Sequence, residues 1–274
     1  MLPVFFINMG SRPDRLLHVE RQLSTCGLAG TRVEAVTPRD FPPELKGQRE
    51  RSTPSLADGE LACSLSHRKI WRLMLDQAMP AALILEDDVV LASDIGTVLS
   101  DPHLLGHDTD AIQLEAHATA ALVGRPRQTA LAGVTLNRLM SSSLGSAAYV
   151  MTSRLAARLL VRGDLDAVPL DSLLFGRQGG VFYEARILQA VPALAIQLDH
   201  TAAGRQEAGR SDLTPQRASS RHEGRSRPLA ARLARAARHW GNHLRVVTTF
   251  GISGDLWGAR HLRLPVTPDL QSLL

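Results

Sequence analysis

The sequence predicts an α/β protein, and two stretches of the chain carry that prediction. Near the N-terminus an apolar run, residues 4–7, precedes helically spaced apolar residues from Leu16 to Leu23 and an alternating segment at 31–36. Further on, residues 81–85 form an apolar run of strand length. A strand–helix–strand order is typical of parallel strands joined by a crossover helix, and a continuous apolar run is typical of a buried strand. We therefore expect a central parallel sheet with helices on its faces.

The composition narrows the class of protein. The chain has 274 residues, 44% of them hydrophobic, which suits one large α/β domain or one domain with an appendage. It has no run of about eighteen apolar residues, and its N-terminus lacks the basic stretch of a signal peptide. We therefore expect a cytoplasmic protein without a transmembrane helix, in which Cys26 and Cys63 are reduced.

The middle of the chain follows the same pattern. Residues 38–57 are rich in proline and charged residues and are predicted to be a loop. Residues 58–77 are predicted to be a helix, because apolar residues recur at helical spacing and Met79-Pro80 then breaks the pattern. A further strand is expected at residues 111–115.

The C-terminal part differs in composition, so we divide the chain into a domain of residues 1–215 and a basic helical extension of residues 216–274. Residues 201–226 are predicted to be a mobile loop that orders over a bound ligand, and residues 228–244 an amphipathic helix. A basic amphipathic helix can lie on an anionic inner-membrane face, although such helices more often cover a domain's own core. Nucleic acid is not an expected partner, because no binding motif accompanies the excess of arginine.

Three consecutive acids, Glu86, Asp87 and Asp88, follow the apolar run at 81–85. Like charges side by side repel one another, and partial burial at a strand end adds to that cost. A hard divalent cation such as Mn²⁺ or Mg²⁺ removes both costs, because these ions bind carboxylate oxygens. The acids therefore indicate a metal site; the alternative is a solvated acidic turn after a core strand.

Three polar side chains follow the first strand, namely Asn8, Arg12 and Arg15. Ligands of open α/β sheets bind at the carboxyl ends of strands, and guanidinium groups suit phosphate oxygens. The alternative is that the two arginines pair with Asp14 or Glu20 on a solvated face.

Several short stretches carry, in one order, a resemblance to a known family. They are Ile7-Asn8 with Arg12–Arg15, Gly59–His67, Leu83–Asp88, Gly145–Thr152, Pro169–Asp171, and Pro192–Gln197 with Ser211–Leu213. This order resembles glycosyltransferase family 25, the lipopolysaccharide and lipooligosaccharide glycosyltransferases, which also includes collagen galactosyltransferases. The resemblance covers about residues 3–213, with mild departures at Met9, Ala62 and Leu170.

The resemblance implies a fold of the GT-A type, Rossmann-like, with a mostly parallel central sheet flanked by helices. It implies transfer of a hexose, often galactose, from a UDP-sugar donor to a saccharide or glycolipid acceptor, with inversion. It also implies Mn²⁺ or Mg²⁺ ligation by Glu86 and Asp88. The nucleotide-sugar contacts that it implies are Asn8, Arg12, Arg15, Ser66, His67, Glu86 and Asp87.

An inverting transfer needs a general base, and the resemblance favours Asp171 for that role. The alternative is that Asp171 caps the helix that begins there, and backbone N–H groups would then weaken it as a base. Asp110 is expected to contact the donor sugar by fold analogy alone. His200 is an equally plausible metal ligand or surface histidine.

Two other classes of function stay open at this point. A metal-dependent phosphohydrolase would use the acidic triplet, but it would want a second cluster of Asp and His. A non-catalytic glycan- or nucleotide-binding protein of the same fold would be favoured by loss of Glu86 or Asp88, and both are present.

Overall fold

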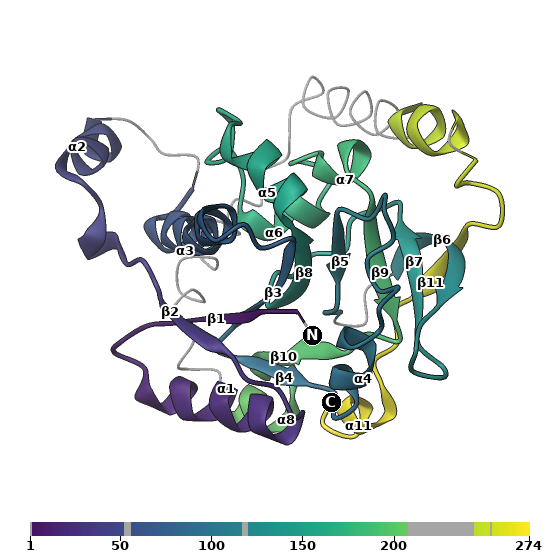
Figure 1. Ribbon diagram of the computed structural model, residues 1–274. Coiled ribbons are helices and arrows are strands. Elements are labelled where there is room, and N and C mark those ends of the chain that lie inside the picture. Colours follow the sequence, from purple (N-terminus) through teal and green to yellow (C-terminus); the bar gives the residue numbers. More distant parts are fainter. Residues whose placement is uncertain (1, 52–55, 117–119, 208–243, 253) are drawn as a thin grey trace, which may run out of the picture.

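The computed structural model describes residues 2–51, 56–116, 120–207, 244–252 and 254–274 (Figure 1). Its main sheet contains nine strands within these residues, in the order β11-β6-β7-β9-β5-β8-β3-β1-β2. The strands are β1 (Val4–Asn8), β2 (Thr31–Glu34), β3 (Ala81–Glu86), β5 (Ala111–Gln113), β6 (Ala120–Gln128), β7 (Thr135–Leu139), β8 (Ala148–Thr152), β9 (Ile187–Val191) and β11 (Arg260–Arg263).

The α/β fold class predicted from the sequence is confirmed, and the sheet is mixed in direction. Among the described strands, three neighbouring pairs are parallel, β1–β2, β1–β3 and β5–β9. The other five pairs are antiparallel. The expected parallel order therefore holds for the N-terminal part, whereas β8 lies between β3 and β5 and runs against both.

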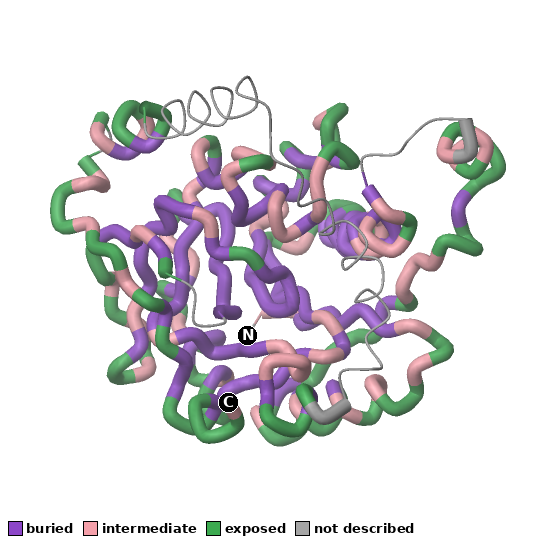
Figure 2. Tube along the Cα trace, turned by 180° about the vertical axis from the view of Figure 1, so that it is seen from behind, coloured by how far each residue is buried: buried purple, intermediate pink, exposed green. Residues whose placement is uncertain are grey.

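Helices and a small second sheet cover the two faces of the main sheet (Figure 1). One face carries α3 (Asp58–Asp76), α5 (Ser153–Leu160), α6 (Leu170–Phe175) and α7 (Val181–Glu184). The other carries α1 (Pro13–Thr25), α4 (Ile95–Leu99), α8 (Ala202–Glu207), α11 (Pro268–Gln271), and the antiparallel pair β4 (Val89–Leu91) and β10 (Ala195–Gln197). The buried residues concentrate between these layers (Figure 2).

The N-terminal elements form for simple reasons. All five residues of β1 are buried, and so are the five apolar residues of β3, so both strands need apolar side chains on both faces. Helix α1 begins with Pro13, whose fixed φ suits a first turn, and ends before Gly27, which has a φ of +65°. In α3, Glu60 accepts a hydrogen bond from the backbone N–H of Ala57, so its carboxylate closes the first turn.

Two expectations about loops are corrected. Residues 38–57 contain the short helices η1 (Pro38–Asp40) and α2 (Pro43–Arg51) within their described part, because prolines at the start of each are compatible with a first helical turn. In residues 201–226, the described part forms α8, and the rest lies outside the described residues.

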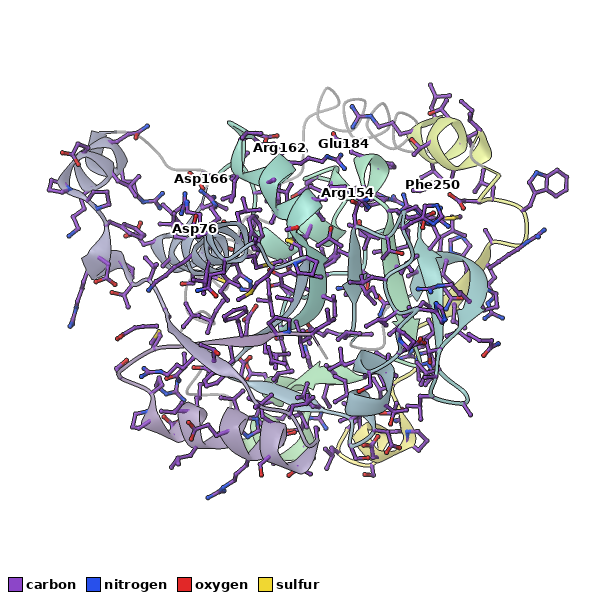
Figure 3. All side chains as sticks on the ribbon, in the orientation of Figure 1. Asp76, Arg154, Arg162, Asp166, Glu184 and Phe250 are labelled. Carbon is purple, nitrogen blue, oxygen red and sulfur yellow. The ribbon has the colours of Figure 1, made fainter. Side chains whose placement is uncertain are left out.

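The described part of the C-terminal region contributes a strand to the main sheet and apolar residues to the core. Strand β11 pairs with β6 and so covers an edge that would otherwise expose its N–H and C=O groups. After a π-helical turn, η4 (Val247–Gly251), lies a chain segment whose Leu264, Val266 and Leu270 join the main core. Phe250 is fully buried and stacks on Phe182 of α7 (Figure 3).

The boundary expected between residues 215 and 216, and the amphipathic helix expected at 228–244, fall on residues outside the described part except for Leu244. Among the helices that are described, none is both long and apolar enough to cross a bilayer.

Candidate active site

The acidic motif lies where β3 ends. Glu86 is the last residue of β3, Asp87 and Asp88 form the turn, and β4 begins at Val89. Parallel pairing sets Glu86 beside Ile7, so that Asn8, the last residue of β1, lies next to the turn. The sheet register thus brings the two stretches that the sequence analysis selected to one edge of the sheet.

Asp87 is held by residues from the first strand and helix. Its Oδ2 accepts a hydrogen bond from Asn8 Nδ2 at 2.8 Å, and its Oδ1 accepts one from Arg15 Nη1 at 3.2 Å. Arg32 Nε in turn donates to Asn8 Oδ1 at 3.0 Å, which fixes the amide. Burial raises the pKa of Asp87, and the bonds from Asn8 and Arg15 oppose that rise. Asn8 and Arg15 therefore act here as supports of the acidic turn.

Asp88 has one paired and one unpaired oxygen. Its Oδ2 lies 3.3 Å from Arg15 Nη1, while its buried Oδ1 has no hydrogen-bond partner among the described residues. Burial, followed by the charge of Glu86, raises the pKa of Asp88 to about 7, although Arg15 opposes the shift. A buried carboxylate oxygen without a partner costs free energy, and a cation would supply the missing contact.

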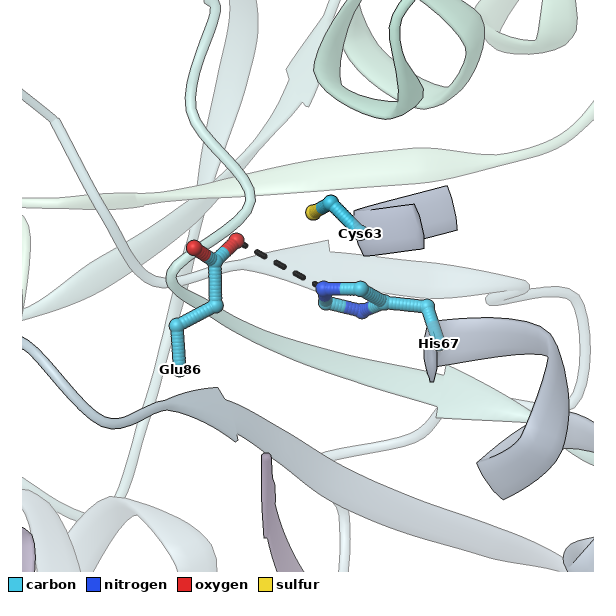
Figure 4. A group of neighbouring side chains, drawn as sticks. All are labelled: Cys63, His67 and Glu86. Atoms are coloured by element: carbon cyan, nitrogen blue, oxygen red, sulfur yellow. Dashed lines mark ion pairs between the residues drawn. The ribbon is translucent and has the colours of Figure 1, made fainter. Parts of the chain in front are cut away.

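Glu86 faces a buried polar chain that begins on α3. His67 Nε2 lies 3.5 Å from Glu86 Oε1, and Ser146 Oγ donates to the same oxygen at 2.8 Å (Figure 4). On its other side, His67 Nδ1 lies 2.9 Å from the hydroxyl of Tyr149, which also accepts from Trp71 Nε1 at 3.2 Å. His67, Trp71 and Tyr149 are fully buried, so Glu86 is anchored from the core.

Glu115 is a further acid of this site that the sequence analysis did not select. It is fully buried, it accepts from the backbone N–H of Ala147 at 2.7 Å, and its Oε1 has no partner. Burial raises its pKa well above the usual range, and the charges of Glu86, Asp88 and Asp171 raise it further. A Cβ on Gly145 would lie 2.6 Å from its carboxylate, so glycine is required at that position.

Glu115 also links Asp171 to the cluster. Asp171 is half-buried in the first turn of α6, close enough for its charge to act on Glu115. Its Oδ1 accepts the backbone N–H of Ser172 at 2.6 Å. The residue at the N-cap position is Pro169, so Asp171 is not the cap itself.

Other selected residues take places beside or away from this cluster. Arg12 pairs with Asp14, Nη2 to Oδ2 at 2.8 Å, as the alternative interpretation foresaw. Ser66 is buried; its Oγ donates to Ala62 O and accepts from Val36 N, both at 2.8 Å, so it ties α3 to the end of β2.

Asp110 does not reach the cluster. It precedes β5, whereas Glu115 follows it, and its Oδ1 accepts from Arg154 Nε at 2.9 Å (Figure 3). Asp110 and Glu115 thus lie at opposite ends of β5, and the expected contact of Asp110 with the donor sugar stays a prediction. His200, in the turn η2 (Leu198–His200), is half-buried, and burial lowers its pKa.

Two sets of residues could hold a metal ion. Cys63, His67 and Glu86 offer ligand atoms that lie within 4.8 Å of one another (Figure 4). Sulfur and imidazole in such a set suit a softer ion such as Zn²⁺. Glu86 and Asp88 offer oxygens only, which suits Mg²⁺ or Mn²⁺, and the unpaired Oδ1 of Asp88 fits that role.

The fold and this site define an α/β protein in which strand β3 ends in three acids beside the carboxyl end of β1. The sequence model of glycosyltransferase family 25 (LPS biosynthesis protein) matches residues 1–174, and the chain belongs to that family. The predicted resemblance is thereby confirmed, and the protein is a glycosyltransferase of this family.

The names of two relatives are consistent with this family. The chain is 22% identical to a lipooligosaccharide biosynthesis protein of Haemophilus influenzae, lic2B, over 70% of this chain and 75% of that one. It is 26% identical to the lacto-N-neotetraose biosynthesis glycosyltransferase LgtB of Neisseria gonorrhoeae, over 72% of this chain and 74% of the relative. Among solved structures, a glycosyltransferase involved in glycosylation of the major capsid of PBCV-1 gives a TM-score of 0.43 at 12% identity, over 76% of this chain and 98% of that one.

Proposed function

We propose that this chain transfers a hexose, with galactose favoured, from a UDP-sugar to a bacterial surface glycan such as lipooligosaccharide, with inversion. One observation carries the proposal: a chain of a glycosyltransferase family holds Glu86 and Asp88 at the end of β3, where the charges of Glu86, Asp88 and Asp171 all act on the buried Glu115. Relatives named for lipooligosaccharide and lacto-N-neotetraose biosynthesis support a saccharide acceptor.

The proposed cofactor is Mn²⁺ or Mg²⁺, held by Glu86 and Asp88. Arg15 pairs with Oδ2 of Asp88, and the buried Oδ1 has no hydrogen-bond partner among the described residues. When bound, such an ion would neutralise the charge that develops on the departing diphosphate. Anchoring of Glu86 by Ser146 and His67 would hold one ligand in place before the ion arrives.

The residues around the acids take complementary roles in this proposal. Arg15, which lies beside Asp87 and Asp88, contacts the phosphates of the nucleotide sugar, and Arg12 contacts them by giving up its ion pair with the exposed Asp14. Asn8 and Asp87 orient Arg15, since both belong to the same hydrogen-bonded group. Ser66 and His67 act through their neighbours, the first by fixing α3 and the second by fixing Glu86.

Asp171 is the proposed general base. It is half-buried and so accessible to an acceptor hydroxyl, from which it would take the proton during transfer. Glu115 is the competing acid, but it is fully buried, whereas Asp171 is half-buried and open to an acceptor hydroxyl. Burial also raises the pKa of Glu115 well above its usual range.

Calorimetric titration with UDP-galactose and UDP-glucose, each with and without Mn²⁺, tests the proposal. Tighter binding of UDP-galactose that requires Mn²⁺ is the expected result. Failure to bind either sugar nucleotide would support a non-catalytic protein instead. Release of inorganic phosphate from simple phosphate esters would support a phosphohydrolase.

A further inference from the structure

The described residues enclose a second site, a cavity of about 670 Å³ remote from the acids. It lies over β6, β7 and β9 and is closed by the segments 106–109 and 254–257. Thr109 at its edge comes before β5, whereas Glu115 of the acidic cluster comes after it. The cavity and the acidic cluster therefore lie at opposite ends of β5, and a ligand in one does not touch the other.

Three arginines in the cavity wall lack an acidic partner. Arg125 and Arg127 come from β6 and Arg138 from β7, and no carboxylate of the described residues lies within ion-pair distance of any of them. Their hydrogen bonds go to backbone carbonyls instead. Arg125 Nε donates to Trp257 O at 2.8 Å, and Arg127 donates to His103 O at 2.5 Å and to Leu104 O at 2.6 Å. Arg138 donates to the carbonyls of Phe182 at 3.2 Å, Ala185 at 2.7 Å and Ile187 at 3.4 Å. Carbonyls orient a guanidinium group without cancelling its charge.

Arg138 is a buried member of the three. It is 8% exposed, and within the described part of the chain its Nε has no hydrogen-bond partner. Burial, followed by the charge of Arg186, lowers its pKa to about 10, so the cation is disfavoured where it stands. A buried cation of this kind is stabilised by an anion that enters the cavity.

The two carboxylates of the wall are already engaged by a fourth arginine. Arg186 Nε lies 3.0 Å from Asp108 Oδ2, and Arg186 Nη1 lies 3.6 Å from Asp255 Oδ1. Four guanidinium groups and two carboxylates therefore face the cavity, which leaves its wall positive. A carboxylate oxygen carries two lone pairs, so a carboxylate that pairs with an arginine can also accept a hydrogen bond from a hydroxyl group.

Two glycines make room for this arrangement. Gly258 has a φ of +81°, and a Cβ there would lie 2.9 Å from Arg125 Nε. A Cβ on Gly124 would lie 3.1 Å from the Cβ of Arg138. Both arginines thus lie against bare backbone, so the positive wall is built into the fold rather than formed by surface side chains that meet by chance.

We propose that this cavity binds an anionic saccharide, that is, a sugar ring that carries a phosphate or a carboxylate. The anionic group lies among Arg125, Arg127 and Arg138, and hydroxyl groups of the sugar donate to Asp108 and Asp255. Trp257 is 74% exposed at the rim and offers an aromatic face to the apolar side of the ring. A wall with both signs of charge suits a ligand that has hydroxyl donors as well as an anion, better than a ligand with anionic groups only.

The test is calorimetric titration with glucose 6-phosphate, glucuronate, glucose and inorganic phosphate. The unaltered protein should bind the two anionic sugars at one site and more tightly than glucose or phosphate. Arg125→Gln should weaken that binding roughly tenfold, which corresponds to loss of one hydrogen bond to a charged group. Trp257→Ala should weaken binding of the sugars but leave phosphate unaffected. Arg21→Gln removes an equally exposed arginine of α1 and should change nothing.

Several results would overturn the assignment. Affinity that is unchanged in a protein with both Arg125→Gln and Trp257→Ala would place the ligand elsewhere. Displacement of glucose 6-phosphate by UDP, or its loss in Asp88→Asn, would assign it to the acidic site. No saturable binding up to about 10 mM would remove the site altogether. None of these measurements requires transfer activity, so failure of the proposed reaction would leave this test intact.

Discussion

His67 and Glu86 face each other across the inner wall of the acidic site, with Nε2 of the histidine 3.5 Å from Oε1 of the glutamate. The indole N–H of Trp71 can only donate, so the hydroxyl of Tyr149 accepts it. Tyr149 is fully buried, and His67 Nδ1 is the other atom bonded to this hydroxyl among the described residues, so we assign the hydroxyl hydrogen to that bond. That order leaves the proton of His67 on Nε2, pointing at Glu86. A chain of buried side chains on α3 and β8 thereby sets the orientation of a proposed metal ligand.

Tyr149→Phe should disturb that orientation. The change leaves Trp71 and His67 without their shared partner, so turnover should fall roughly tenfold and more Mn²⁺ should be needed for half-maximal activity, as for other outer partners of metal ligands. Kinetic titration with Mn²⁺ measures both effects. Tyr183→Phe is the matched control, because the hydroxyl of Tyr183 has no hydrogen-bond partner in the residues that the structure describes. Equal Mn²⁺ requirements in both variants would refute the orienting role.

Asp88→Asn should reduce transfer roughly a hundredfold or more while the protein stays folded. The amide is neutral, so it relieves the buried charge but binds a divalent cation poorly. Transfer from UDP-galactose and thermal unfolding measure the two consequences. Asp76→Asn, at the exposed end of α3 (Figure 3), is the control. Normal turnover in Asp88→Asn would end the metal assignment.

Removal of metal by EDTA should abolish transfer, and Mn²⁺ or Mg²⁺ should restore it. These ions should restore the activity of the Cys63→Ser protein equally well, because hard cations bind Glu86 and Asp88 through oxygen. If the active ion were instead held by Cys63, His67 and Glu86, restoration would need Zn²⁺ and would fail in Cys63→Ser. Metal-dependent activity of the two proteins, measured side by side, separates these outcomes.

Asp171→Asn should lower turnover by roughly two to four orders of magnitude, since general bases contribute about that much. The KM for the donor should change little, because the base acts on the acceptor hydroxyl. Steady-state kinetics and the melting temperature decide the matter. A loss that appears mainly as a lower melting temperature would make Asp171 a structural residue of α6.

Glu115 makes the stability of the fold depend on pH. Its pKa is raised well above the ordinary value of 4.5 by burial, so the folded state binds this proton more tightly than the unfolded state. The stability that follows is fully present below about pH 4.5 and is lost as the pH rises toward the pKa in the folded state. Glu115→Gln keeps the shape without a charge, so its unfolding free energy should decline less between pH 5 and pH 8. Parallel denaturation curves for both proteins across that range would contradict the argument.

Much of the site could be predicted from local sequence. An apolar strand that ends in Glu86-Asp87-Asp88 predicts a metal site. The strand–helix–strand opening places Asn8 and Arg15 at the same edge of the sheet as these acids. These inferences depend on hydrophobic periodicity and on the charges of adjacent residues, and both can be read directly from the sequence. Glu115 could not be predicted as a site residue, because a single acid after a short strand has the same local sequence pattern as many solvent-exposed acids.

What the sequence determined by itself was the α/β class, the family, and the acidic turn after β3, because each depends on neighbours along the chain. Only the tertiary structure decided which acids share one environment, how Tyr149 and His67 support Glu86, and that β11 completes the sheet. Burial and long-range pairing set these relationships, and both arise when residues distant in the sequence pack together. The arginine cavity has the same origin, since its wall gathers Arg125, Arg138 and Trp257 from separate segments.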